Sequence, residues 1–194
     1  MSKPDLEKIL FLDIETAPLV YRYSDLDETT KGLWDRKWQH NRDISPEEQY
    51  AKAGIYAEFA KVICIGLGHC KKRKFEVFTF ASDDEKEILA RFSEFLTLSF
   101  SSPQNVLCAH NGREFDFPFL CRRLIINGMP LPKLLQIQGL KPWEVPHIDT
   151  MDMWKFGDYK SFSSLSLLAH IFGIPSPKDD LDGSKVSKTY HEEH

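Results

Sequence analysis

Several features are scarce in this 194-residue chain, and each scarcity excludes a class of protein. No apolar run approaches the roughly 18 residues that a membrane-spanning helix needs, so we expect no membrane role. The N-terminal residues lack the basic and then apolar pattern of a secretory signal. The four cysteines form no CxxC pair, and three of them lie in apolar runs typical of strands. We therefore expect small core side chains in a reducing compartment, with the cytoplasm as the location.

An excess of positive charge is also missing. The chain has 25 Lys and Arg against 29 Asp and Glu, which gives a formal net charge of −4. This balance argues against a protein that coats nucleic acid by bulk charge. It does not argue against an enzyme that holds a strand end through bound cations. The length predicts one domain over residues 1–194, without internal repeats or low-complexity tracts.

Apolar and alternating runs predict an α/β fold with a mixed five-stranded sheet. The segment from residue 21 to residue 60 is polar and carries Trp34 and Trp38 four positions apart, which indicates a helical insertion after the first strand. A Ser-Pro-Glu-Glu start signal at residue 45 supports this interpretation. The strands are expected at 9–14, 62–69, 75–80, 106–109 and 147–151, and helices at 82–96, 117–127 and 165–172, the last capped by Ser163.

Two acids follow each other closely in the first predicted strand. Asp13 and Glu15 are two positions apart, so they point to the same face about 6.5–7 Å from each other. Apolar neighbours would make the two carboxylates repel and desolvate one another unless a cation lies between them. Hard divalent ions such as Mg²⁺ are the natural partners of clustered carboxylate oxygens.

A third acid, Asp116, stands at the start of the helix that follows the fourth strand. A helix-capping role would explain Asp116 alone, and a turn would explain Asn111. Neither role explains why three acids lie at strand ends or helix starts of the central sheet. That edge is where open α/β sheets usually place their sites.

The motifs around these acids resemble a known family. Phe-Leu-Asp-Ile-Glu-Thr at 11–16 resembles the first motif of the 3′→5′ proofreading exonucleases of the ribonuclease-H-like superfamily. Ala-His-Asn at 109–111, continued through Phe115-Asp116 to residues 118–120, is similar to their second motif. The likeness is greatest to the exonuclease domain of family-B DNA polymerases and to stand-alone exonucleases related to it, and it covers most of the chain outside 21–60.

The resemblance implies a ribonuclease-H-like fold, a five-stranded mixed sheet flanked by helices, with a specific site. Asp13 and Glu15 would ligate a catalytic metal, Asp13 would bridge to a second ion, and Asp116 would hold that second ion. The cofactors would be two Mg²⁺ or Mn²⁺ ions, and the partner would be the 3′ end of single-stranded DNA. Three further residues would line the substrate site: Thr16, Asn111 and Phe115.

One family feature is absent. The third motif, Tyr-x-x-x-Asp on a final helix, has no counterpart before His194, although residues 178–186 resemble the linker that precedes it. Tyr190 and His194 have the spacing without the acid. We interpret Asp182 as a turn residue and Asp149 as structural, whereas Arg122 or Arg123 could contact phosphate. The expectation is that the final helix is missing and that activity depends on a fourth acid supplied beyond residue 194.

Three other interpretations stay open. The same fold and chemistry could act on RNA, since no residue is identified that reads a 2′-hydroxyl. A degenerate nuclease fold could bind nucleic acid without cleaving it. An unrelated α/β domain could use its acids as caps and ion-pair partners. Protein partners are not predicted by the sequence.

Overall fold

The structure of the chain is a computed structural model that describes residues 5–40, 43–158, 160–175 and 190–192. Five strands form one sheet in the order β3-β2-β1-β4-β5. The strands are β1 (Ile9–Pro18), β2 (Ala60–Lys71), β3 (Lys74–Ala81), β4 (Val106–Ala109) and β5 (Ile148–Asp149). The α-helices are α1 (Glu28–Trp38), α2 (Pro46–Gln49), α3 (Glu85–Ser99), α4 (Asp116–Ile126), α5 (Thr150–Lys155) and α6 (Leu165–Ile171). Short 3₁₀ helices occur at η1 (Leu6–Lys8), η2 (Tyr23–Asp25), η3 (Tyr50–Ile55) and η4 (Lys133–Leu135).

The sheet is mixed, as the sequence predicted. β1, β2 and β3 form an antiparallel meander, and β4 and β5 run parallel to β1. β4 pairs with β1 only from Ile9 to Phe11. The last seven residues of β1 therefore project past β4, and their second edge is available to other parts of the chain.

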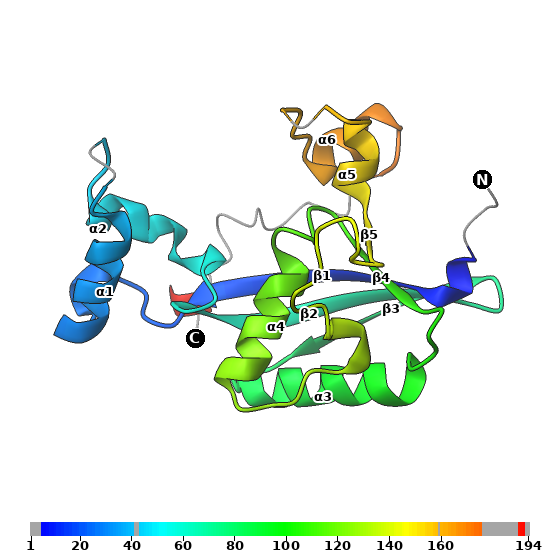
Figure 1. Ribbon diagram of the computed structural model, residues 1–194, viewed down its shortest axis with the longest axis horizontal. Coiled ribbons are helices and arrows are strands. Elements are labelled where there is room, and N and C mark those ends of the chain that lie inside the picture. The colour runs from blue at the N-terminus through cyan, green and yellow to red at the C-terminus, as the bar shows by residue number, and fades with distance from the viewer. Residues whose placement is uncertain (1–4, 41–42, 159, 176–189, 193–194) are drawn as a thin grey trace.

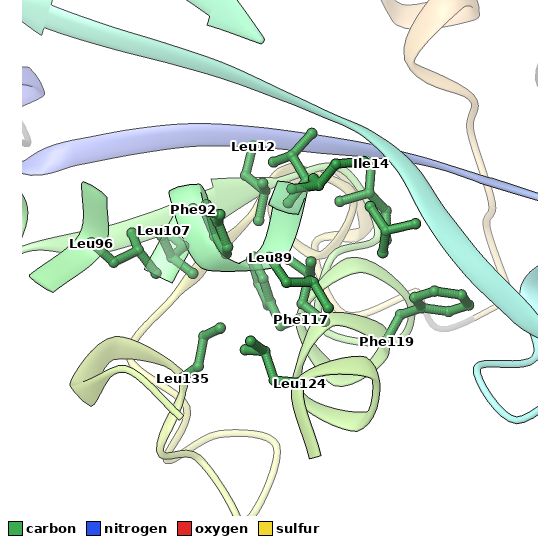
Figure 2. Packing of buried hydrophobic residues seen from close by; sticks show 14 of the residues in the cluster. Leu12, Ile14, Leu89, Phe92, Leu96, Leu107, Phe117, Phe119, Leu124 and Leu135 are labelled. Atoms are coloured by element: carbon green, nitrogen blue, oxygen red, sulfur yellow. The ribbon is translucent and has the colours of Figure 1, made fainter. Parts of the chain in front are cut away.

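The main core lies between the sheet and the helices α3 and α4. Figure 2 shows Leu12 and Ile14 of β1 directed toward Leu89 and Phe92 of α3 and Phe117 of α4. All five side chains are buried. α5 and α6 lie on the other side of the sheet (Figure 1). This division sends alternate β1 side chains into the core and leaves the intervening ones on the opposite face.

The insertion is helical and has a small aromatic core of its own. The Trp34 ring is fully buried, and its Nε1–H donates to the carbonyl of Pro46 at 2.7 Å. Trp38, Tyr50 and Phe59 pack their rings around it, with centroids 5.8, 5.1 and 4.9 Å away. Trp34 and Trp38 thus share a face, as their spacing predicted, and that face holds the insertion together.

Some element boundaries differ from those predicted. β1 continues to Pro18, so Asp13 lies in the middle of the strand and not at its end. The fifth strand has only two residues because the Asp149 carboxylate accepts the Met151 N–H at 2.9 Å and caps α5. The helix caps are Asp84 for α3 and Ser164 for α6, each close to the serine that was expected to open the helix.

Within the described residues, no helix is long and apolar enough to cross a membrane. The motif-like stretch at 178–186, including Asp182, and His194 lie outside the described residues.

Candidate active site

The two acids of β1 lie on the sheet face opposite the core. Leu12 and Ile14 are buried beneath α3 and α4, whereas Asp13 is exposed and Glu15 is half-buried. The antiparallel register places Asp13 opposite Gly66 and Glu15 opposite Cys64 of β2. The strand therefore presents both carboxylates on one face, as their i, i+2 spacing predicted.

Asp116 reaches the same part of β1 from α4. It is the first residue of that helix and is 2% exposed. Its Oδ1 accepts the backbone N–H of Ile14 at 3.2 Å, on the stretch of β1 that β4 leaves unpaired. Asp116 does not cap its own helix, because the cap position is Phe115 and carries no side-chain hydrogen bond. The fold thus brings the carboxylate of Asp116 next to the strand that carries Asp13.

Several acidic groups lie near one another in this region, and their mutual repulsion and burial disfavour the ionised forms. Burial raises the pKa of Asp116 to about 7, the charge of Asp13 adds to the rise, and that of Asp149 contributes less. The hydrogen bond from Ile14 acts in the opposite direction. On β2, burial raises the pKa of the Cys64 thiol, and the charges of Glu15 and Asp13 contribute. Negative potential is therefore concentrated where β1 meets α4, and a cation there would favour the ionised carboxylates.

The loop between β4 and α4 is fixed by Asp149, for which a structural role was predicted. Asp149 is 3% exposed, and its Oδ1 and Oδ2 accept the backbone N–H groups of Asn111 at 2.9 Å and Arg113 at 3.1 Å. Asn111 has φ +66°, a left-handed conformation that asparagine tolerates better than most residues. The hydrogen bond between Asn111 and Asp149 is thus made by the backbone N–H of Asn111 and not by its side chain. An acid between a strand and a helix start was the only sequence signal for this role.

Gly112 allows α4 to begin where it does. A Cβ at this position would lie 2.4 Å from the Cβ of Ala109 and 2.8 Å from Cζ of Phe117. Both neighbours belong to the packed junction of β4 and α4, so neither can yield at low cost. Gly112 lies inside the second motif, but no local sequence signal distinguishes it from an ordinary loop glycine.

His110 joins the sheet edge to α5 and the start of α6. Its Nε2 is 2.8 Å from the carbonyl of Ser163, which can only accept, so Nε2 carries a hydrogen. Nδ1 is 2.9 Å from the Thr150 hydroxyl. The ring is consequently held by two partners and forms a fixed wall near Asp13.

A cleft of about 880 Å³ opens at this wall, between the sheet edge and the helices α5 and α6. Asp13, His110 and Thr150 contribute its polar side. The rest is largely apolar and includes Met153, Trp154, Phe156, Leu165, Leu168 and Phe172. Asp13 thus stands at the border of a cavity large enough for a nucleotide-sized ligand.

The other predicted substrate residues have structural contacts. The Thr16 hydroxyl donates to the carbonyl of Gly54 at 2.7 Å, which attaches the insertion to β1. The Phe115 ring packs against Phe119 with centroids 5.4 Å apart and contacts the main core. Their role in substrate binding stays a prediction that rests on the resemblance.

Arg123 is buried, contrary to the interpretation in which it meets phosphate. It is 4% exposed, and its Nε and Nη2 donate to the two carboxylate oxygens of Glu85, while Nη1 donates to the carbonyl of Ala57 at 2.8 Å. Asn127 also donates to Glu85, at 2.9 Å. These bonds lock α4 to α3 and to the end of the insertion. Arg122 is exposed.

The donor chemistry of the site suits a hard divalent cation, since Asp13, Glu15 and Asp116 offer only carboxylate oxygens. As their side chains stand, the described parts of the chain contain no group of three or more His, Cys, Asp or Glu residues arranged to hold a metal ion. We call Asp13 and Asp116 the acid pair: Asp116 accepts the backbone N–H of Ile14, the residue next to Asp13, so both acids lie at the same part of β1.

The sheet order and the helices on both faces are those of the ribonuclease-H-like fold. The family described as the RNase_H superfamily matches residues 52–192. The chain therefore belongs to the RNase_H superfamily. No curated protein sequence matches it significantly.

Solved structures share this fold at low sequence identity. The family B DNA polymerase from the archaeon Pyrobaculum calidifontis aligns with a TM-score of 0.58 and 16% identity, over 97% of this chain and 21% of the polymerase. The zinc-bound complex of E. coli exonuclease I with single-stranded DNA aligns with a TM-score of 0.50 and 12% identity, over 95% of this chain and 39% of the exonuclease. The chain thus spans about a fifth to two fifths of the length of these proteins.

Proposed function

We propose that this chain removes nucleotides from the 3′ end of single-stranded DNA by hydrolysing phosphodiester bonds. The observation that carries the proposal is that Asp116, from a distant part of the sequence, accepts the backbone N–H of Ile14. Ile14 directly follows Asp13, which borders a cleft of about 880 Å³. The likeness of the fold to an exonuclease solved with single-stranded DNA supports the choice of substrate.

Two divalent cations, Mg²⁺ or Mn²⁺, are part of the proposal, with Asp13, Glu15 and Asp116 as their ligands. When bound, such a pair activates the attacking water and stabilises charge on the leaving 3′-oxygen. The protein contributes fixed positions: β1 carries Asp13 and Glu15 on one face, and the Ile14 N–H holds the carboxylate of Asp116 at the same strand.

The apolar side of the cleft fits the terminal nucleotide. Trp154 and Phe172 pack edge to face with centroids 5.7 Å apart, and both line the cavity that Asp13 borders. Nucleic-acid bases stack on aromatic side chains without strong sequence preference. A terminal base held there would direct its phosphate toward the acids.

The test is digestion of a 5′-labelled single-stranded DNA with Mn²⁺ by the wild-type chain and by Asp13→Ala. The wild type should give a ladder that shortens from the 3′ end, and Asp13→Ala should reduce the rate at least a hundredfold, because one carboxylate ligand of both cations is lost. Asp83→Ala, which removes an exposed acid at the start of α3, is the matched control and should digest normally.

Two results would redirect the proposal. A wild-type chain that leaves DNA intact but shortens a matching RNA would make it an exoribonuclease. A chain that binds either strand without shortening it at any Mn²⁺ concentration would make it a binding module on a nuclease fold. Equal rates for the wild type and Asp13→Ala would refute the assignment of the acids.

A further inference from the structure

The sheet face that carries Asp13 continues as an aromatic and apolar surface across β2 and β3. Phe11 precedes Asp13 by two positions and therefore shares its face. The Phe11 ring meets Phe75 of β3 edge to face, with centroids 5.6 Å apart. Phe75 is 59% exposed, and Val77, two positions further along β3, is 72% exposed. Large apolar side chains are thus exposed to solvent on the same sheet face as the acids.

Two glycines of β2 leave this face of the sheet without side chains at their positions. Gly66 lies opposite Asp13, and Gly68 lies opposite Phe11 and Val77. A Cβ at Gly68 would stand 2.7 Å from Cζ of Phe75, so the phenylalanine ring occupies the space that a side chain at Gly68 would need. The result is a shallow platform on which the Phe75 ring is accessible. Exposed aromatic rings of this kind stack with unpaired bases.

The far end of the platform is strongly basic. Lys71, Lys72, Arg73 and Lys74 form the tip of the β2–β3 hairpin, and all four are exposed. We call this segment the basic tip. The Lys72 N–H donates to Glu7 at 2.9 Å, which anchors the loop to the chain just before β1. In a chain whose net charge is −4, this is a local concentration of positive charge.

The turn within the basic tip uses residues that its geometry disfavours. Lys72 and Arg73 form a two-residue loop with φ +49° and +63°. A hairpin loop with positive φ at both positions prefers Asn-Gly, because in this conformation the Cβ of most residues comes too close to the following carbonyl oxygen. The sequence instead places two cations at these positions. Backbone strain of this kind is found preferentially at functional sites.

The register sets the distance between the acids and the basic tip. Gly66 lies opposite Asp13, and Lys71 is five residues further along β2. At the rise of an extended strand this is roughly 17 Å. The Phe11–Phe75 pair lies between the two. Acids, aromatic platform and cations therefore follow one another along the same part of the sheet.

We propose that this surface binds the upstream part of a single-stranded nucleic acid, with bases on Phe11 and Phe75 and phosphates on the basic tip. The inference rests on the proposed function, since it places the strand end at Asp13. Charge complementarity and continuity with the acids select a polyanion with exposed bases over a protein partner.

The test measures the affinity of a fluorescein-labelled oligothymidylate for the full chain carrying Asp13→Asn, in which the proposed hydrolysis is disabled. Binding is followed by fluorescence anisotropy at several salt concentrations, with Mn²⁺ and with EDTA. The double variant Lys72→Asn with Arg73→Gly should bind about tenfold more weakly, and the slope of log affinity against log salt should fall by about 1.4, which is two contacts at roughly 0.7 each.

The same double variant separates binding from folding. Asn-Gly suits the turn, so the melting temperature should rise by about 2–4 °C while the affinity falls. Lys86→Gln with Lys133→Gln removes the same charge from exposed positions on α3 and η4, and should leave both the affinity and the slope nearly unchanged. Phe75→Leu keeps an apolar side chain without the ring and should also weaken binding about tenfold.

Equal losses in the two double variants would overturn the proposal, because bulk charge would then explain the binding. If the Asp13→Asn chain binds neither this oligothymidylate nor an oligouridylate of the same length, the proposal is overturned as well. The digestion assay is independent of these results: a wild-type chain that shortens DNA while its basic-tip variant binds normally would retain the proposed function and lose this inference.

Discussion

The backbone N–H of Ile14 donates to the carboxylate of Asp116 at 3.2 Å, across 102 positions of sequence. Ile14 therefore packs its side chain into the core, while its backbone N–H positions the carboxylate of Asp116. The bond exists because β4 stops pairing with β1 at Phe11, which leaves the next N–H groups of that edge to α4. Strand length and helix start together decide where the acid pair forms.

The acid pair predicts stabilisation by a divalent cation. Mn²⁺ that binds only the folded chain should raise its stability by about 2.7 kcal/mol at a concentration one hundred times its Kd. For a chain of this size that corresponds to an increase in Tm of roughly 5–10 °C. Differential scanning fluorimetry with and without Mn²⁺ measures the shift. The increase should be clearly smaller in Asp116→Asn, which loses a ligand of the second cation, and persist in full in Asp83→Asn; an equal increase in all three proteins would contradict a cation site at Asp116.

The buried ion pair between α3 and α4 predicts a large loss of stability when one partner is removed. Arg123→Met leaves the carboxylate of Glu85 buried with its strongest donors gone, which typically costs about 3–5 kcal/mol. Urea unfolding measures the loss. Replacing both partners, as Glu85→Gln with Arg123→Met, should recover part of it, because no buried charge is left uncompensated. A double variant less stable than Arg123→Met would show that the charge is not the cause.

Two glycine substitutions should have opposite effects. Gly112→Ala inserts a methyl group against Ala109 and Phe117 and should destabilise the chain by about 1–3 kcal/mol. Gly32→Ala meets nothing within 4 Å in the interior of α1 and should stabilise the chain by about 0.5–1 kcal/mol. Because Gly112 precedes α4, its variant should also lower the rate of the proposed hydrolysis. Chemical unfolding and digestion of both variants test this pairing.

Much of the fold followed from local patterns. The apolar run of β1 and the alternating pattern of β3 predicted strands, and the helix predicted at 82–96 corresponds to α3. Gly128, just after α4, has φ +70°, a conformation that glycine adopts without a Cβ clash and that commonly follows the end of a helix. These features are set by residues close together in the sequence, so periodicity is sufficient to predict them.

The features that escaped prediction depend on contacts between distant segments. The burial of Arg123 is set by Glu85, 38 positions earlier, and no local pattern links them. The carboxylate of Asp149 fixes the conformation of the loop at Asn111, 38 positions earlier in the sequence. A basic side chain on a helix and an acid before a helix each have several ordinary explanations, and only tertiary packing chooses among them.

His147 makes stability depend on pH. The ring is 1% exposed: its Nδ1 accepts the Leu107 N–H at 3.2 Å, and its Nε2 lies 2.8 Å from the carbonyl of Leu134. Burial lowers its pKa to about 4 from the ordinary value of 6.5, and the charge of Arg113 adds to the fall. The unfolded chain therefore binds the proton more readily than the folded chain between pH 6.5 and 4.

Stability should consequently fall as the pH drops through that window, by up to roughly 3 kcal/mol for 2.5 pH units at 1.36 kcal/mol each. Asp116 acts in the opposite sense: its pKa is raised to about 7, so the folded chain is the better proton acceptor between pH 4 and 7. Urea unfolding from pH 7 to pH 4.5 should therefore compare Asp116→Asn with the double variant Asp116→Asn and His147→Gln. The single variant should lose stability steeply on acidification, and the double variant should be less stable at pH 7 but have a shallower slope. Parallel slopes for the two proteins would refute the assignment to His147.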